Sequence, residues 1–199
     1  MRRVELLSPA KNVDVAIAAI NNGADAVYIG GPAFGARKAV GNSLEDIEKA
    51  VRYAHRFYCR VFVTLNTILY DEELPEVERL IHGLYKIGVD AIIVQDLAVL
   101  KLDLPPIALH ASTQMHNYDL ERIKFLDRLG FQRVVLAREL SLAQLREIRR
   151  EVKAELEYFV HGALCVSLSG QCYMSQEAVS SVLRAEVWFP PFYFPGWNG

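Results

Sequence analysis

The stretch that decides the fold is NNGADAVYIG at residues 21–30, where an amphipathic segment ends at a glycine and a short apolar run follows. The arrangement returns as YKIGVDAIIV at residues 85–94 and as RLGFQRVVL at residues 128–136. Glycine suits the left-handed backbone position that ends a helix. Each copy therefore predicts a helix that is followed at once by a strand, and repeated βα units build a parallel sheet.

The rest of the chain continues this alternation. Strands are expected near residues 4–8, 26–30, 60–66, 91–95, 107–113, 133–138 and 155–160. Helices are expected near residues 12–22, 43–57, 72–87, 117–129 and 142–152, with an irregular crossover at 97–104. A closed (β/α) barrel has eight strands and typically about 250 residues. The predicted fold class is therefore α/β, an incomplete TIM-barrel-like fold of about seven strands, with a doubly wound open sheet as the alternative.

The composition excludes several classes of protein. The 199 residues are 52% hydrophobic and 23% charged, which supports a folded core and excludes a disordered chain. The apolar runs are far shorter than the ~20 residues of a membrane span, and the first is too short for a signal peptide. Three cysteines without a secretory signal indicate reduced thiols and a cytoplasmic protein. A charge of −2 indicates no polyanion-binding surface over the whole chain.

Polar residues and glycines follow nearly every predicted strand. The ends read Ser8, Gly30-Gly31, Asn66, Gln95-Asp96, Ser112-Thr113-Gln114, Arg138-Glu139 and His161-Gly162. Chemistry in a barrel lies at the carboxyl ends of the strands. The ring predicts a site at this rim in which Asn66 and Gln114 bind substrate, although strands also end simply where polar loops begin.

The last predicted strand directs a carboxylate inward. Its period of two places Glu157 and His161 on the inner face. The same period places the side chains of Leu156, Tyr158 and Val160 on the opposite face, which packs against the helices. A buried carboxylate is costly unless it is paired or protonated. Glu157 and His161 are therefore catalytic candidates, and Arg138 is a candidate either for catalysis or for neutralising Glu157.

Two cysteines lie in the loop after this strand. Cys165 and Cys172 are separated by six residues that include glycine and serine. This spacing differs from a zinc knuckle, so by itself it favours two unrelated free thiols. A cysteine protease would pair Cys165 with His161 or His116.

The same segment carries a resemblance to a known family. Glu-x-Phe-x-His-Gly-Ala-Leu-Cys at residues 157–165, continuing as Gly-x-Cys-x-Met-Ser at 170–175, resembles the signature of the collagenase-like peptidase family U32. Supporting matches include ELLSPA at 5–10, GADAVY at 23–28, GN at 41–42, TLN at 64–66, STQ at 112–114 and AREL at 137–140. The resemblance covers roughly residues 4–178 and implies a barrel-like N-terminal domain.

The resemblance also implies an activity and a cofactor. The family name records a peptidase, whereas other members resemble oxygen-independent hydroxylation factors for tRNA, ribosomal RNA or ubiquinone precursors that bind an iron–sulfur (4Fe-4S) cluster through four cysteines. By that similarity, Cys165 and Cys172 match the first two cluster ligands. The branch for tRNA wobble-uridine hydroxylation, which uses prephenate as hydroxyl donor, looks closest. The family is enzymatic, but this chain lacks the later cluster cysteines.

The chain departs from the family near its end. Residues 1–178 are expected to form the barrel-like domain, and residues 179–199 form an atypical tail with both tryptophans, several prolines and no cysteine. The tail reads as a frame-shifted or truncated end, with a natural aromatic docking segment as the alternative. The third cysteine, Cys59, precedes the strand at 60–66 and is expected at the opposite rim. The chain alone is therefore not expected to complete a four-thiolate cluster.

Three functions remain open at this point. The first is an iron–sulfur-dependent RNA-modifying enzyme or its remnant, in which Arg37, Lys38 and Arg138 contact phosphate or a carboxylate substrate; the alternative for Arg37 and Lys38 is a solvated loop. The second is a peptidase that uses Glu157, His161 and Cys165. The third is a non-catalytic barrel fragment that binds a partner, or a second copy of itself, through its open edge.

Overall fold

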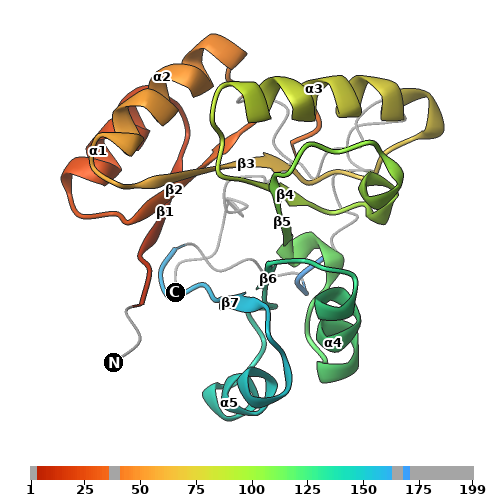
Figure 1. Ribbon diagram of the computed structural model, residues 1–199. Coiled ribbons are helices and arrows are strands. Elements are labelled where there is room, and N and C mark those ends of the chain that lie inside the picture. The colour runs from red at the N-terminus through yellow and green to blue at the C-terminus, as the bar shows by residue number, and fades with distance from the viewer. Residues whose placement is uncertain (1–3, 36–40, 163–167, 171–199) are drawn as a thin grey trace, which may run out of the picture.

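The computed structural model describes residues 4–35, 41–162 and 168–170. One parallel sheet of seven strands, arranged in chain order, forms the inside of the molecule (Figure 1). Its strands are β1 (Leu7–Ala10), β2 (Ala26–Gly30), β3 (Arg60–Leu65), β4 (Ala91–Val94), β5 (Ala108–Ala111), β6 (Arg133–Val135) and β7 (Glu155–Glu157). The prediction of an incomplete barrel is confirmed, because the sheet curls into a half-barrel with β1 and β7 at its two edges.

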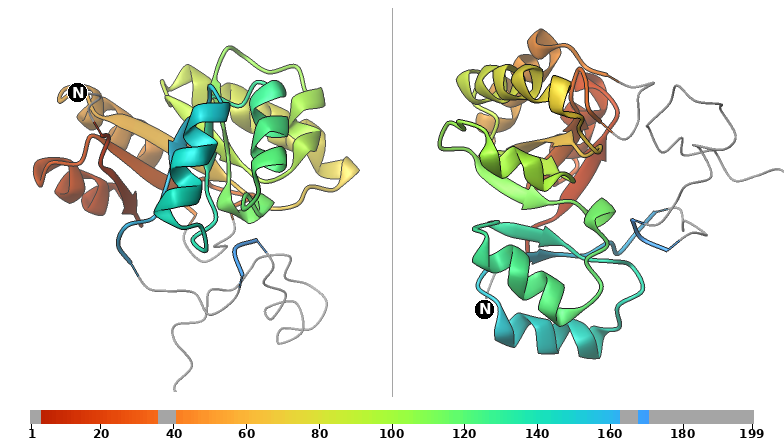
Figure 2. Two further views of the ribbon diagram at one scale, coloured as in Figure 1. Left: turned by 90° about the horizontal axis from the view of Figure 1, so that it is seen from below. Right: turned by 90° about the vertical axis from the view of Figure 1, so that its right-hand side faces the viewer.

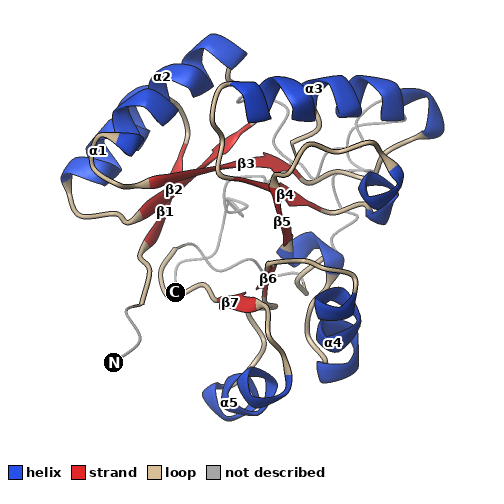
Figure 3. Cartoon of the chain, viewed as in Figure 1, coloured by secondary structure: helices blue, strands red, loops and turns tan. Residues whose placement is uncertain are grey.

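Helices cover the outer face of this sheet (Figure 3). They are α1 (Val13–Asn21), α2 (Leu44–His55), α3 (Leu74–Lys86), α4 (Leu120–Arg128) and α5 (Leu142–Glu151). Short 3-10 turns occupy η2 (Asp71–Glu73), η3 (Leu97–Lys101) and η4 (Thr113–Met115). Figure 2 shows the helices in two groups, with α1, α2 and α3 beside the first strands and with α4 and α5 beside the last. None of the helices in the described ranges has the length and apolar character that a bilayer span needs.

The repeated helix–glycine–strand unit fixes the register of the sheet. Its glycines, at 23, 88 and 130, have φ values of 97°, 88° and 92°, as a helix-ending position requires. Two residues after each glycine, a side-chain oxygen accepts a hydrogen bond from a backbone N–H at the neighbouring strand. The donor–acceptor pairs are Leu6–Asp25 at 2.9 Å, Val61–Asp90 at 2.7 Å and Leu109–Gln132 at 2.6 Å.

The sheet has an apolar outer face and a mixed inner face. Strand residues that point outward, such as Val27, Val63 and Ile92, are fully buried against the helices. The inner face carries a smaller apolar cluster of Ala26, Phe62, Ala91 and Ile93. Each outward side chain is buried between the sheet and the helices. Burial of this apolar surface supplies the main stabilisation of the half-barrel. The concave face carries charged and polar side chains beside its smaller apolar cluster.

Strand boundaries differ from the prediction by up to three residues, and most at β1, β6 and β7. β1 spans Leu7–Ala10, so Ser8 lies inside the strand and not at its end; Pro9 is tolerated there because β1 is an edge strand. β7 ends at Glu157 because only its three residues pair with β6. Val160 was expected to pack on the helices, but it lies beyond the strand and is 87% exposed.

Candidate active site at the carboxyl-terminal rim

Loops at the carboxyl ends of β3 and β5 meet at one place on the rim. Asn66 Nδ2 donates to Ser112 Oγ at 3.5 Å, and the same hydroxyl accepts from the backbone N–H of Gln114 at 3.2 Å. Ser112 is buried, whereas Asn66 and Gln114 are half-buried. The structure thus brings together the two residues that the strand-end pattern singled out for substrate binding.

Asn117, which the sequence pattern did not single out, joins this place to the next strand. Its side-chain amide donates to the backbone carbonyl oxygens of Ser112 and Val135, both at 2.8 Å. Its backbone carbonyl oxygen accepts from the backbone N–H of Ala137 at 3.0 Å. Asn117 is fully buried, and its Oδ1 has no hydrogen-bond partner among the described residues. It lies past the end of β5 with no motif around it, so only the fold reveals its role.

The loop after β6 carries Arg138 and Glu139. The Tyr158 hydroxyl lies within hydrogen-bond distance of two backbone carbonyl oxygens and can donate to either: that of Arg138 at 3.0 Å and that of Leu140 at 2.7 Å. Arg138 Nε donates to Ser169 Oγ at 3.2 Å. Arg138 is half-buried and lies at the rim, as expected from its place after β6. The position fits a group that meets substrate at the strand ends.

Glu139 is held as a carboxylate at the same rim. It accepts a hydrogen bond from the backbone N–H of Ser169 at 2.8 Å. Partial burial opposes ionisation, but the hydrogen bonds from the N–H groups of Ser169 and of Glu139 itself outweigh it and lower the pKa of this carboxyl. The ionised carboxylate is the acceptor for the Ser169 N–H.

Glu157 points inward as predicted, but its partner is Arg133 and not Arg138. Arg133 Nη1 lies 3.4 Å from Glu157 Oε2 and 2.7 Å from Glu5 Oε1, and Arg133 also binds Glu155. The register explains why Arg133 is the partner, because β6 pairs Arg133 with Glu155, two residues before Glu157 on the same face. Arg138 lies beyond the end of β6.

Aromatic rings line the other side of this charged cluster. The guanidinium carbon of Arg133 lies 5.1 Å from the centroid of the Phe62 ring, and that of Arg60 lies 5.5 Å from it. The His110 ring meets the edge of Phe62 with centroids 4.7 Å apart. Arg60 also forms an ion pair with Glu5. The inner face at the amino-terminal end of the strands is therefore filled by side chains that bind one another.

Burial and charge shift three pKa values in this cluster. Burial raises the pKa of Glu157, although Arg133 opposes the shift. The hydrogen bond from Arg133 lowers the pKa of Glu155 against a smaller effect of burial. Burial, aided by the nearby Arg133 and Arg60, lowers the pKa of His110 to about 3. His110 is therefore neutral at ordinary pH, and its buried Nδ1 has no hydrogen-bond partner among the described residues.

The other predicted site residues are not brought together. His161 is exposed beyond the end of β7, and within the described ranges no hydrogen bond links it to Glu157. Arg37, Lys38, Cys165 and Cys172 lie outside the described residues. No three of the His, Cys, Asp and Glu side chains in the described part of the chain gather as metal ligands.

Cys59 lies at the opposite end of the sheet from the rim. It immediately precedes β3, is buried, and donates from its Sγ to the carbonyl oxygen of Ala24 at 3.1 Å. Burial raises the pKa of its thiol, and Asp25 adds to the shift. A buried, protonated thiol at this end is not available to a site at the strand ends.

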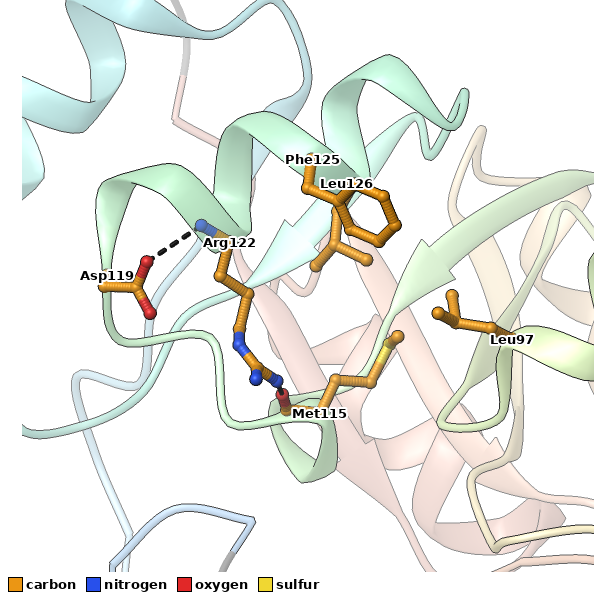
Figure 4. A pocket seen from close by; sticks show the side chains of 6 residues that line it. All are labelled: Leu97, Met115, Asp119, Arg122, Phe125 and Leu126. Carbon is orange, nitrogen blue, oxygen red and sulfur yellow. Dashed lines mark hydrogen bonds between the residues drawn. The ribbon is translucent and has the colours of Figure 1, made fainter.

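A hollow of about 410 Å³ lies outside the half-barrel, beside α4 (Figure 4). It is lined by Leu97, Met115, Asp119, Arg122, Phe125 and Leu126. Its polar groups serve the fold, because Asp119 caps α4 by accepting from Arg122 N and the Arg122 guanidinium donates to the Met115 carbonyl. The convergent polar groups lie at the rim, and we take the rim as the candidate site.

Residues 11–181 match the sequence model of peptidase family U32. The chain belongs to peptidase family U32. Among curated proteins, it is 58% identical over 173 residues to the 23S rRNA 5-hydroxycytidine C2501 synthase of Escherichia coli (strain K12), covering 87% of the chain. It is 35% identical over 178 residues to the tRNA hydroxylation protein P1 of Bacillus subtilis (strain 168), again over 87% of the chain.

This U32 chain corresponds to a part of each relative. It spans 26% of the length of the Escherichia coli protein and 42% of the Bacillus subtilis protein. Among solved structures, that of a U32 peptidase superposes with a TM-score of 0.67 at 15% identity, covering 78% of this chain and 68% of the other. That likeness shows the shared barrel-like fold.

Proposed function

We propose that this U32 chain is the barrel part of an enzyme that hydroxylates a pyrimidine base in RNA. The observation that carries the proposal is the 58% identity, over 87% of the chain, to a protein named for 5-hydroxycytidine synthesis in 23S rRNA. The relative named for tRNA hydroxylation matches at 35%. Ribosomal RNA is therefore the first substrate to test, and tRNA, which the motif favoured, is the second.

The rim groups suit the two substrates of such a reaction. Asn66 and Gln114 carry side-chain amides, which offer both donors and acceptors to the edge of an unstacked base. Arg138 carries a guanidinium, which suits the carboxylate of a small hydroxyl donor such as prephenate. Arg37 and Lys38 would contact RNA phosphates, which position a nucleic acid without reading its sequence. Such an enzyme acts in the cytoplasm, where its RNA is found.

The cysteines of this chain fit half of a four-cysteine cluster site. Cys165 and Cys172 flank Ser169, which is bound at the rim by Arg138 and Glu139. Cys59 is buried at the other end of the sheet. Cys165 and Cys172 would hold iron at the strand ends, and the two other ligands would come from outside residues 1–199. An iron–sulfur cluster, when bound, supplies iron and one-electron chemistry.

The peptidase alternative is less well supported by the described residues. It requires Glu157 and His161 to work with Cys165. Glu157 is bound to Arg133, and His161 is exposed without a hydrogen bond to Glu157 in the described part of the chain. The inner carboxylate is therefore engaged in an ion pair and not in orienting a base, which a nucleophilic mechanism needs.

A chimera tests the proposal directly. This chain would replace the matching portion of the Escherichia coli synthase in a strain that lacks the native protein, and mass spectrometry would measure 5-hydroxycytidine in 23S rRNA and hydroxylated uridine in tRNA. We expect hydroxylation of one RNA, lost in Cys165→Ser and in Cys172→Ser and retained in the matched control Cys59→Ser. Absence of hydroxylation in both RNAs, or full activity in both cysteine variants, would contradict the proposal.

A further inference from the structure

Four helix–strand turns of the described chain share one backbone form. In each turn, the N–H of a residue with positive φ donates to the carbonyl oxygen three residues before it, and the next N–H donates to the carbonyl oxygen five residues before its own position. In three of these turns the residue with positive φ is a glycine, at Gly23, Gly88 and Gly130. In the turn between α2 and β3 it is Tyr58, with a φ of 58°. A tyrosine therefore occupies the position where this fold otherwise uses glycine.

The packing of the described residues does not offset the strain at Tyr58. A left-handed backbone conformation is costly for a residue that carries a Cβ. The Tyr58 side chain is 96% exposed, more than any other large apolar side chain in the described part of the chain. Its ring therefore gains little from burial. A strained residue that the core does not use is a candidate for a functional contact.

The last turn of α2 places arginines and aromatic rings next to this tyrosine. Arg52 and Arg56 are four residues apart, which puts them on one face of the helix, and both are exposed. Tyr53 and Phe57 are also four residues apart, and their ring centroids are separated by 5.1 Å. Phe57 is 50% exposed, so this aromatic pair is open to solvent on one side. We call residues 52–58 the basic–aromatic turn.

The carboxylates near the basic–aromatic turn leave its arginines unneutralised. Asp90 lies 3.0 Å from Nε2 of His55 and also accepts a hydrogen bond from the backbone of β3. Glu48 precedes Arg52 by one helical turn and is exposed. Within the described ranges, no carboxylate forms an ion pair with Arg52 or Arg56. The helix dipole favours cations at this end of α2, but it does not account for exposed aromatic rings beside them.

A single strand of RNA matches this combination of groups. Arginine binds phosphate oxygens, and aromatic rings stack on unpaired bases of any identity. The whole chain has a charge of −2, so a local basic surface is needed to attract a polyanion. β3 has six residues, so the basic–aromatic turn lies about 20 Å from the carboxyl-terminal rim. An RNA whose reacting base is at the rim would therefore meet this turn through other nucleotides.

We propose that the basic–aromatic turn binds a single-stranded segment of the RNA substrate. Phe57 and Tyr58 stack on bases, and Arg52 and Arg56 contact phosphates. The choice of RNA as the ligand rests on the proposed function. The turn is then a docking surface that holds the substrate by nucleotides remote from the hydroxylated base.

RNA binding by the chain tests this surface without the reaction. The probe is a fluorescent single-stranded RNA of about 12 nucleotides, and its anisotropy measures the dissociation constant. Tyr58→Gly removes a stacking ring, so we expect the affinity to fall at least about fivefold. The same change relieves the left-handed strain, so Tm should rise by about 2–4 °C, which excludes misfolding as the cause of the loss. Tyr58→Phe keeps the ring and should keep the affinity, and unchanged affinity in Tyr58→Gly overturns the proposal.

Salt dependence tests the arginines. Each phosphate contact to a single strand adds about 0.7 to the slope of log affinity against log salt concentration. The double variant Arg52→Gln/Arg56→Gln should therefore lower that slope by about 1.4. Arg128→Gln is the matched control, because Arg128 is exposed in the last turn of α4, close to one of the glycine turns. An equal effect per arginine in the control would show general charge attraction and overturn the assignment to the turn.

Contact with a second copy of the chain is the other use that such a surface could have. Sedimentation velocity measures self-association of the wild-type chain and of Tyr58→Gly. A dimer that dissociates in Tyr58→Gly, with the affinity for RNA unchanged, would assign the turn to a protein contact and overturn the proposal.

Kinetics of the purified chimera separate this docking surface from the proposed function. If the turn holds the substrate, Tyr58→Gly raises the KM for the RNA at least about fivefold and raises it by a larger factor than it lowers kcat. An active chimera with an unchanged KM in Tyr58→Gly overturns the docking role, and the proposed function stands. A chimera that hydroxylates neither RNA, while its RNA binding still depends on Tyr58, overturns the proposed function, and the docking surface stands.

Discussion

Two polar clusters occupy opposite ends of the same half-barrel, and they are built in different ways. The cluster at the amino-terminal end of the strands joins charged side chains to one another, with Arg133 bound to Glu5, Glu155 and Glu157. The cluster at the carboxyl-terminal rim joins side chains to backbone, as Asn117, Tyr158 and Glu139 do. The first fills the concave face, and the second fixes the shape of loops.

This difference separates stability from function along one set of strands. The Arg133–Glu5 contact spans 128 residues and links the segment before β1 to β6 across the inner face. Buried charges of this kind stabilise only when all partners are present. Loops held at the strand ends instead present side chains to a substrate. Substitutions at the two ends should therefore affect different measurements.

Replacing Arg133 should cause the largest loss of stability. Arg133→Met leaves the Glu5 and Glu157 carboxylates without their buried cation, and removing one partner of a buried ion pair typically costs about 3–5 kcal/mol. Urea denaturation measures the free energy of unfolding. Arg60→Met is the contrast, because its side chain is 44% exposed and such pairs contribute about 1 kcal/mol or less. Equal losses of unfolding free energy in the two variants would contradict the claim that the buried Arg133 contributes more than the exposed Arg60.

Replacing Arg138 should instead reduce activity. In the chimera, Arg138→Gln removes the guanidinium that we assign to a carboxylate substrate, and we expect kcat/KM to fall about 10- to 100-fold, or about 1.4–2.7 kcal/mol of transition-state stabilisation. The free energy of unfolding should change by less than about 1 kcal/mol, as is usual away from buried networks. Arg146→Gln on the exposed surface of α5 is the control. A loss of stability as large as that of Arg133→Met would place Arg138 with the structural cluster.

His110 should make the amino-terminal cluster sensitive to acid. Its folded pKa of about 3 lies below the unfolded value of about 6.5, so the unfolded chain takes up the proton first as the pH falls. The stability that this group contributes is present above pH 6.5 and is lost toward pH 3, by up to about 1.4 kcal/mol per pH unit. Unfolding of His110→Leu, measured from pH 4 to 7, should show a slope shallower by that amount. Parallel curves would contradict the lowered pKa, because they would show that His110 takes up its proton at the same pH in the folded and the unfolded chain.

The two glutamates of β7 should respond to pH in opposite directions. Glu155, with a lowered pKa, stabilises the fold above its ordinary pKa near 4.5, and this is lost as the pH falls through its folded pKa. Glu157 has a raised pKa, so its contribution to the free energy of unfolding is largest below pH 4.5. That contribution is lost as the pH rises through the folded pKa of Glu157. At pH 7, Glu155→Gln should destabilise by less than about 1 kcal/mol because its side chain is 59% exposed, and Glu157→Gln should be neutral or stabilising. Thermal melts at pH 4 and 7 measure both, and equal signs at pH 7 would contradict the assignment.

The sequence predicted the placement of elements because the signals for them are local. Each helix–glycine–strand unit lies within ten residues, and each predicted strand and helix overlaps an element of the described residues, although β1 is displaced and β6 and β7 are shorter than expected. The rim residues Asn66, Gln114 and Arg138 could be found for the same reason, since they follow strands. Asn117 and Ser169 could not, because their value lies in partners that come close only after folding.

The sequence by itself determined the α/β alternation, the inward direction of Glu157 and membership of a family through the motif at residues 157–175. A period of two tells which face a side chain occupies, but it does not tell which residue lies opposite on the next strand. Only the tertiary structure decided that Arg133 and not Arg138 meets Glu157, and that Ser169 is bound by loops 30 and more residues away. The register of the strands and the contacts of the loops depend on packing across the whole sheet. No single segment of the sequence determines that packing.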